Sequence, residues 1–130
     1  MNKLLIGGLV TVASALLTVS ATADEISFEN DVLPILNIHC LMCHMPGGEQ
    51  GDLTLHPNPY GNLVNIPSVQ SGLKLVEPGS SAQSYLYLKL IDTQAEFGGS
   101  GGIMPFQTDP LDTGQIEIIR SWIDQGAKNN

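Results

Sequence analysis

Residues 40–44 read Cys-Leu-Met-Cys-His (CLMCH) and contain the only two cysteines of this 130-residue chain. Two cysteines separated by two residues, with a histidine directly after them, suit a disulfide, a zinc site or a covalently attached haem. Small domains commonly depend on such a staple. The rest of the sequence therefore has to indicate whether CLMCH forms a disulfide, a zinc site or a haem attachment site.

The zinc and disulfide interpretations each lack a second element that they need. Structural zinc uses four ligands, normally from two spaced pairs, and the chain has no second CxxC pair. His39, His44 and His56 would complete a zinc site only with unusual spacing. A redox-active CxxC normally lies in a βαβ unit, for which we find no pattern. Both interpretations remain as minor alternatives.

The spacing C-x-x-C-H is the attachment pattern for c-type haem. Residues i, i+3 and i+4 lie on one face of a helical turn. Cys40 and Cys43 can then each form a thioether to a haem vinyl carbon, while the imidazole of His44 reaches the iron. CLMCH thus predicts one covalent haem c, with His44 as the proximal axial ligand.

The distal axial position on the iron has three interpretations. Met104 is far from CLMCH in the sequence, in the Gly/Pro-rich segment 97–106 (FGGSGGIMPF), and its thioether is a suitable soft ligand. The methionines inside and directly after CLMCH are too close to His44 to reach the opposite face. His56 is the competing ligand, and an open position is the third alternative. We expect Met104.

The N-terminal 25 residues have the features of an export signal. Lys3 is followed by an apolar run to Ser20 and by Ala21-Thr22-Ala23, a small-x-small cleavage pattern. The alternative is an anchor that is retained. No second apolar run approaches the ~20 residues that span a bilayer. We expect a cleaved signal peptide over 1–23, a domain over 24–130, no stable membrane insertion after cleavage, and export to the periplasm.

The charge of the mature domain limits its partners. Without Lys3, four basic residues face thirteen acidic ones, a net charge of −9. A nucleic acid would be repelled by this charge, so we expect no nucleic-acid binding. Redox protein partners with basic patches are expected instead, since opposite charge steers association. The oligomeric state is left open by the sequence.

Apolar periodicity predicts an all-α fold. The first helix covers about 31–40, with Asp31 as its N-cap. The second lies within 77–91, where Ser80 and Gln83 form a capping-box pattern. Each of the two has an apolar stripe that can face a shared core.

The third predicted helix, within 110–130, has the clearest pattern. Asp112 and Gln115 make a variant of the capping box, and Gly126 is a good terminator. Its apolar stripe consists of Ile116, Ile119 and Ile123, with Trp122 beside it. We expect Trp122 to pack as a core residue between the terminal helices.

The segments between these helices are rich in residues that break regular structure. Residues 44–52, 56–62 and 97–106 read as loops. Within the last of them, GGSGG at 98–102 reads as a flexible element. A short extended piece over 73–79 is a weak prediction.

Taken together, these residues resemble a class I-type monohaem cytochrome c, and more closely the cytochrome c-like modules often fused to larger bacterial proteins. The matching stretches, in the family's order, are FENDVLPILNIHCLMCH (28–44), GLKLVEPGSSAQSYLYLKL (72–90), IMPF (103–106) and LDTGQIEIIRSWIDQGA (111–127). The resemblance implies N- and C-terminal helices that cross beside the haem edge. One departure is that the approach to Met104 is longer and richer in glycine than the short, often basic segment of the family.

The resemblance also implies a function. Cys40 and Cys43 would carry the haem, and His44 and Met104 would fill both axial positions, so the iron would only exchange electrons with partner proteins. We therefore expect an electron carrier and not an enzyme. The alternatives are a haem subunit of a larger oxidoreductase or assembly, and a haem protein that reacts with peroxide or small ligands if Met104 is labile.

Overall fold

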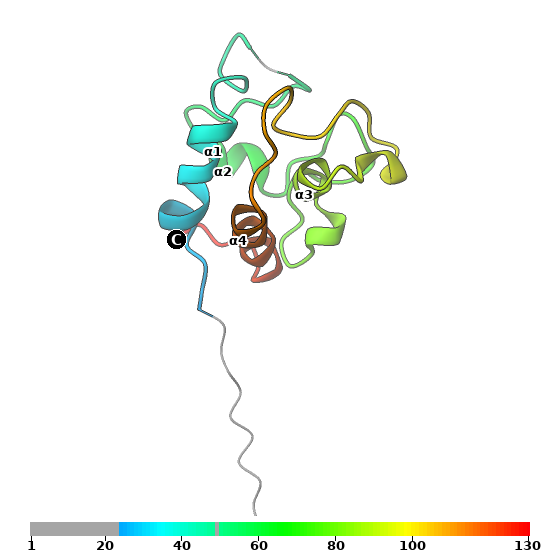
Figure 1. Cartoon of the computed structure of the whole chain (residues 1–130). Helices are drawn as coiled ribbons and strands as arrows, with labels where there is room; N and C mark the ends of the chain where they lie inside the picture. Colours follow the sequence, from blue (N-terminus) through cyan, green and yellow to red (C-terminus); the bar gives the residue numbers. More distant parts are fainter. Residues whose placement is uncertain (1–23, 49) are drawn as a thin grey trace, which may run out of the picture.

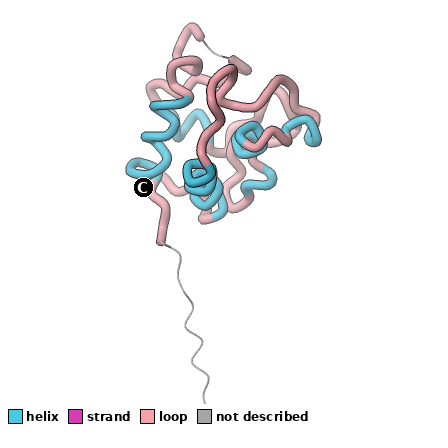
Figure 2. The backbone as a smooth tube through the Cα atoms, viewed as in Figure 1, coloured by secondary structure: helices cyan, strands magenta, loops and turns pink. Residues whose placement is uncertain are grey.

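The computed structural model describes residues 24–48 and 50–130, and over these the chain is helical without any β-strand (Figures 1 and 2). The helices are η1 (Phe28–Val32, a π-helix), α1 (Leu33–His39), α2 (Pro59–Leu63), η2 (Ser81–Gln83, 3-10), α3 (Tyr85–Leu90), η3 (Gln94–Phe97, 3-10) and α4 (Thr113–Asp124). The predicted all-α class is confirmed. No helix in this part of the chain has the length and apolarity needed to cross a membrane. The signal peptide predicted over 1–23 lies outside the described residues.

The first helix begins earlier than predicted. It starts at Phe28 as η1 and continues without a break into α1, with Pro34 in the first turn of α1, where its missing N–H does no harm. The N-cap is Ser27, whose hydroxyl accepts the N–H of Asn30 at 3.1 Å. The prediction that Asp31 is the N-cap is wrong. Its carboxylate instead accepts the N–H of Ser27 at 2.8 Å, from inside the helix.

The predicted capping box at the second helix is also wrong. Ser80 makes no side-chain cap bond, and the chain passes through η2 before α3 begins. The fully buried Ser84 interrupts the helix, because its hydroxyl donates to the carbonyl of Ser80 at 2.8 Å and accepts the N–H of Glu77 at 2.9 Å. A local hydrogen bond of this kind competes with the helical ladder.

Two further segments differ from their prediction. Most of 56–62, read as a loop, forms α2, because Pro59 occupies its first position and the side chain of Asn58 caps it. The extended piece over 73–79 forms only isolated β-bridges, one of them at Val76. Pro59 therefore begins a short helix, and Gly61 lies within it rather than preventing it.

The C-terminal helix α4 begins as predicted. Asp112 accepts the N–H of Gln115 at 2.8 Å, and the Gln115 side chain accepts the N–H of Asp112 at 3.2 Å, so the capping box is confirmed. Just beyond its end, Gly126 has a φ of +104°, which suits glycine. Ile119, Trp122 and Ile123 are the buried residues of this helix.

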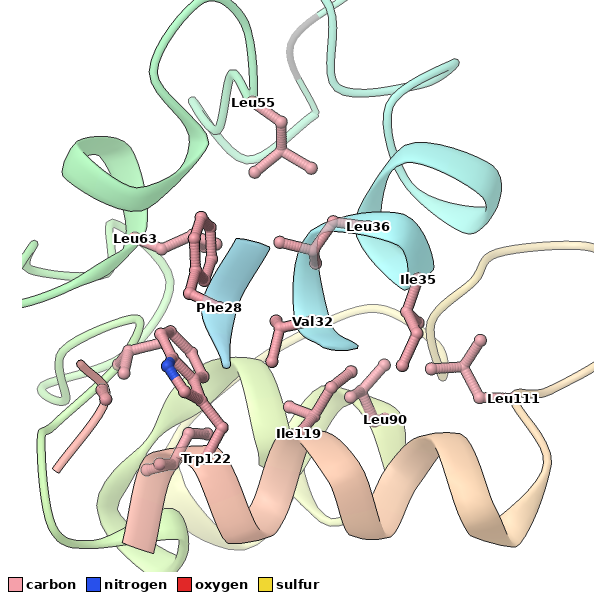
Figure 3. Close-up of a cluster of buried hydrophobic side chains, with 13 residues drawn as sticks. Phe28, Val32, Ile35, Leu36, Leu55, Leu63, Leu90, Leu111, Ile119 and Trp122 are labelled. Atoms are coloured by element: carbon pink, nitrogen blue, oxygen red, sulfur yellow. The ribbon is translucent and has the colours of Figure 1, made fainter. Parts of the chain in front are cut away.

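The N- and C-terminal helices pack against each other (Figure 3). We call their shared interior the terminal core, defined by Phe28, Val32, Ile119, Trp122 and Ile123, which are all at most 3 % exposed. The rings of Phe28 and Trp122 lie 5.3 Å apart, and the indole N–H donates to the carbonyl of Lys128 at 2.9 Å. The terminal core is thus filled by side chains alone, with its one buried N–H satisfied.

The ends of the described domain are tied together (Figure 1). The carbonyl of Asn130 accepts the N–H of Glu29 at 2.9 Å, and its side-chain oxygen accepts that of Phe28 at 3.0 Å. Lys128 also forms an ion pair with Glu25. The C-terminal residues therefore complete the hydrogen bonds that the first turn of η1 leaves open.

Candidate cofactor site

An apolar cavity of about 250 Å³ lies between α1, α3 and the loops that follow CLMCH and precede α4. We call it the inner cavity. Its wall is built mainly from seven leucines, Leu36, Leu53, Leu55, Leu63, Leu75, Leu86 and Leu90. Cys40, His44 and Met104 line the same space. Residues separated by 60 positions in the sequence therefore border one cavity.

A second hollow, of about 450 Å³, adjoins the inner cavity. We call it the outer hollow. Cys43 lines it, and Cys40, His44 and Met104 line it as well as the inner cavity. All four predicted site residues thus line the outer hollow, whose volume is within the size range of sites for small organic ligands.

CLMCH forms the turn that its spacing predicts. The N–H groups of Cys43 and His44 donate to the carbonyl of Cys40 at 3.2 and 3.1 Å, directly after the end of α1. Both cysteines are free; Cys40 is half-buried and Cys43 is exposed. Burial, with a smaller contribution from Cys43, raises the pKa of the Cys40 thiol to about 11. At neutral pH this thiol is therefore protonated.

His44 is held by one hydrogen bond to its ring and one to its backbone. Its Nδ1 lies 3.1 Å from the carbonyl oxygen of Leu53, and a carbonyl can only accept, so Nδ1 carries the proton. Its own carbonyl accepts the N–H of Leu55 at 2.7 Å. This leaves Nε2 without a proton and able to bind a metal, in the arrangement by which the ring of a metal-ligating histidine is usually fixed.

Of the two candidates for the distal ligand, only Met104 lines the same spaces as His44. Met104 is half-buried and lines both spaces, and its N–H donates to the carbonyl of Lys89 at 2.9 Å. His56 is exposed and lines neither space. The geometry therefore favours Met104 over His56.

These residues fit a haem. An apolar wall suits a flat macrocycle, and an imidazole nitrogen, a thioether and two free thiols border the same space. The zinc alternative gains no support, because in 24–48 and 50–130 no group of three or more His, Cys, Asp or Glu side chains is placed to hold a metal ion.

One residue of the cavity was missed by the sequence analysis. Lys89 lines the inner cavity with only 6 % of its surface exposed. Burial lowers the pKa of its ammonium group, while Asp92 opposes that shift. The sequence did carry a signal, because Lys89 follows the buried Tyr85 by four residues on one face of α3, where an apolar side chain is the usual choice.

A direct hydrogen bond links α4 to the residue before CLMCH. The amide nitrogen of Gln115, which also belongs to the capping box, donates to Nε2 of His39 at 3.0 Å. His39 is half-buried and borders only the outer hollow. The start of α4 is thus tied to the end of α1 beside the predicted attachment site.

Comparison with known proteins finds no relative of this chain: no protein-family model, no curated protein and no solved structure matches it. The resemblance to cytochrome c therefore remains an expectation from the sequence motifs. The function is therefore inferred from the residues of the site.

Proposed function

We propose that this chain is an exported monohaem c-type cytochrome that transfers single electrons between redox proteins. The observation that carries this proposal is that His44 and Met104 border one leucine-walled cavity directly beside the CLMCH turn. Neither zinc binding nor a redox-active CxxC pair requires such a cavity. A covalently attached haem with two protein ligands would use all of these parts.

Each residue of the site has a distinct role in the proposal. Cys40 and Cys43 hold the haem covalently, and His44 binds the iron through Nε2, since Nδ1 is engaged with the carbonyl of Leu53. Met104 occupies the other axial position, which prevents substrates from binding there. When bound, the haem supplies one-electron exchange between the ferric and ferrous states. Apolar walls and a thioether ligand both favour the ferrous state.

The surface beside the cavity suits a transient partner. Met42 and Phe106 line the outer hollow and are 87 % and 56 % exposed, so apolar groups surround its entrance. The mature domain as a whole is strongly acidic, with thirteen acidic residues. A redox partner with a basic patch would be steered to it and would bind through a small interface.

The exposed apolar side chains also favour a second candidate, a haem subunit docked in a larger oxidoreductase. Ile38 and Met42, on either side of the first cysteine, are 73 % and 87 % exposed. A permanent interface would cover such groups. Gel filtration of the holoprotein distinguishes the two candidates, because a free carrier elutes as a monomer at micromolar concentration and a subunit with its partner does not.

The optical spectrum of the oxidised holoprotein, matured with the haem-attachment machinery, tests the proposal. We expect the weak far-red band of sulfur–iron charge transfer, and its loss in Met104→Ala. Met45→Ala is the matched control, because Met45 is close in sequence to His44 but lines neither space, so the band should remain. Absence of covalent haem would overturn the proposal.

Other spectra would redirect the assignment. A low-spin spectrum without the far-red band in the wild type would replace Met104 by a nitrogen ligand such as His56. A high-spin spectrum would indicate an open iron and would favour a haem that reacts with peroxide or small ligands.

A further inference from the structure

We infer that Lys89 is a positioning residue for Met104: its buried ammonium group clamps the glycine-rich loop 98–102 and so holds the methionine beside His44. This inference rests on the proposed function, in which Met104 is an axial ligand. It concerns a residue to which the sequence motifs assign no role, and it bears on whether the loop lets Met104 leave the iron.

The clamp has three contact points on one short segment. The ammonium nitrogen of Lys89 donates to the carbonyl of Ser100 at 3.0 Å and to that of Gly102 at 2.5 Å. The backbone carbonyl of Lys89 accepts the N–H of Met104 at 2.9 Å. One residue of α3 thus fixes both the loop and the backbone of the methionine that follows it.

A neighbouring side chain completes the set of loop contacts. The amide nitrogen of Gln94, which is 2 % exposed, donates to the carbonyl of Gly101 at 2.8 Å. Three successive carbonyls, of residues 100, 101 and 102, therefore all have donors from α3 and η3. Because this loop has no regular secondary structure, these side-chain donors are what ties its backbone to α3 and η3.

Two glycines of the loop are needed for different reasons. Gly101 has a φ of +74°, which strains any residue with a side chain. A Cβ on Gly99 would lie 2.6 Å from the ring of Tyr85, so only glycine permits this approach to α3. The segment that the sequence predicts to be flexible is thus a loop whose glycines let it adopt this conformation against α3.

The charge of Lys89 supports a specific role rather than simple packing. Within the described residues it forms no ion pair with a carboxylate, and Asp92 acts on it only electrostatically. A buried ammonium without a paired anion is costly. A methionine side chain would occupy similar space without that cost, so the bonds to the loop carbonyls are what the ammonium adds.

The test compares Lys89→Met with Lys74→Met in the holoprotein. Lys74 is the matched control, because it also loses one charge and two polar contacts, to Asn65 and Glu77, but lines neither space. We measure the rate of carbon monoxide binding to the reduced protein, the far-red band of the oxidised protein, and the thermal midpoint. Carbon monoxide can bind only when Met104 leaves the iron.

We expect Lys89→Met to bind carbon monoxide at least about tenfold faster than the wild type and to show a weaker far-red band, since each lost charge-assisted bond corresponds to about a tenfold change in an equilibrium. Its thermal midpoint should be equal or higher, because a buried charge is removed. Lys74→Met should match the wild type in both ligand readouts. A merely structural role for Lys89 would lower the midpoint without this selective effect.

The failure of this inference differs from that of the proposed function. A wild-type protein without the far-red band contradicts the function itself. A wild type with the band, together with a Lys89→Met variant of unchanged carbon monoxide kinetics, overturns the clamp alone. If Lys89→Met does not yield holoprotein, Gly101→Ala serves instead, because its strained φ displaces the loop from the intact lysine. Faster carbon monoxide binding then supports the clamp, and an unchanged rate overturns it.

Discussion

The terminal core and the inner cavity lie along the same helical segment, which is formed by η1 and α1. In the terminal core, Phe28, Val32 and Trp122 fill the interior with rings and methyl groups. Leu36, four residues after Val32, is one of seven leucines that line a space of about 250 Å³. The terminal core is filled by side chains alone, whereas the inner cavity, in the function we propose, would pack against the haem.

Preventing haem attachment should have the largest effect on stability, and it should affect the inner cavity much more than the terminal core. In the double variant Cys40→Ser, Cys43→Ser, we expect the midpoint of thermal unfolding to fall by at least about 20 °C, since the wall leucines would border an unfilled space of about 250 Å³, at roughly 24 cal/mol per Å³ of cavity. Amide hydrogen exchange should show lost protection over 98–106 and retained protection in α4. Equal loss in both regions would contradict the comparison.

Trp122→Ala removes a large side chain from the terminal core. Removing this 1 %-exposed indole should destabilise the holoprotein by about 3–5 kcal/mol, measured by denaturant unfolding. Trp122 lines neither space, so the far-red band of the folded fraction should be unchanged. A weakened band would mean that the terminal core also determines the iron ligation.

Asp112→Ala tests the connection between α4 and the CLMCH turn. The loss of the N-cap should cost about 1 kcal/mol of stability. The same capping box positions Gln115, which donates to His39 beside CLMCH. Gln115→Ala removes that bond as well, so it should lower protection of the CLMCH turn in hydrogen exchange more than Asp112→Ala does. Equal effects would show that the bond to His39 is unimportant.

The smallest expected effect concerns an exposed ion pair on α4. The hydrogen bonds from Arg120 lower the pKa of the Glu117 carboxyl. A lowered folded-state pKa gives stability that is present above the unfolded pKa and is lost as the pH falls through the folded one. Glu117→Gln should therefore lower the thermal midpoint slightly at pH 7 in low salt, and the difference from wild type should vanish at pH 2–3. A difference that persists in acid would require another cause.

Local patterns predicted some of the local interactions correctly. The capping box of α4 and the turn of CLMCH join residues three or four positions apart, and both are formed as predicted. The prediction for Ser80 failed because the hydroxyl of Ser84, four residues on, donates to the Ser80 carbonyl that a helix starting there would use. Two local patterns competed there, and the sequence alone does not rank them.

Contacts between distant residues were beyond the sequence patterns. The clamp joins Lys89 to carbonyls 11 and 13 positions away, so GGSGG read as flexible when considered by itself. In the same way, the choice between Met104 and His56 depends on which loop folds over the cavity. The composition of a loop predicts its flexibility only when no other part of the chain binds the loop.

The hydrogen bonds between Asn130 and the first turn of η1 mean that the order in which the helices follow one another along the chain is not essential to the domain. Because the two ends of the described domain already lie together, a short linker from Asn130 to Asp24 would cost little closure entropy. New ends could then be placed in the exposed turn near Gly72. Such a circular permutant would carry CLMCH in the C-terminal third of its sequence, with the terminal core and the cavity preserved.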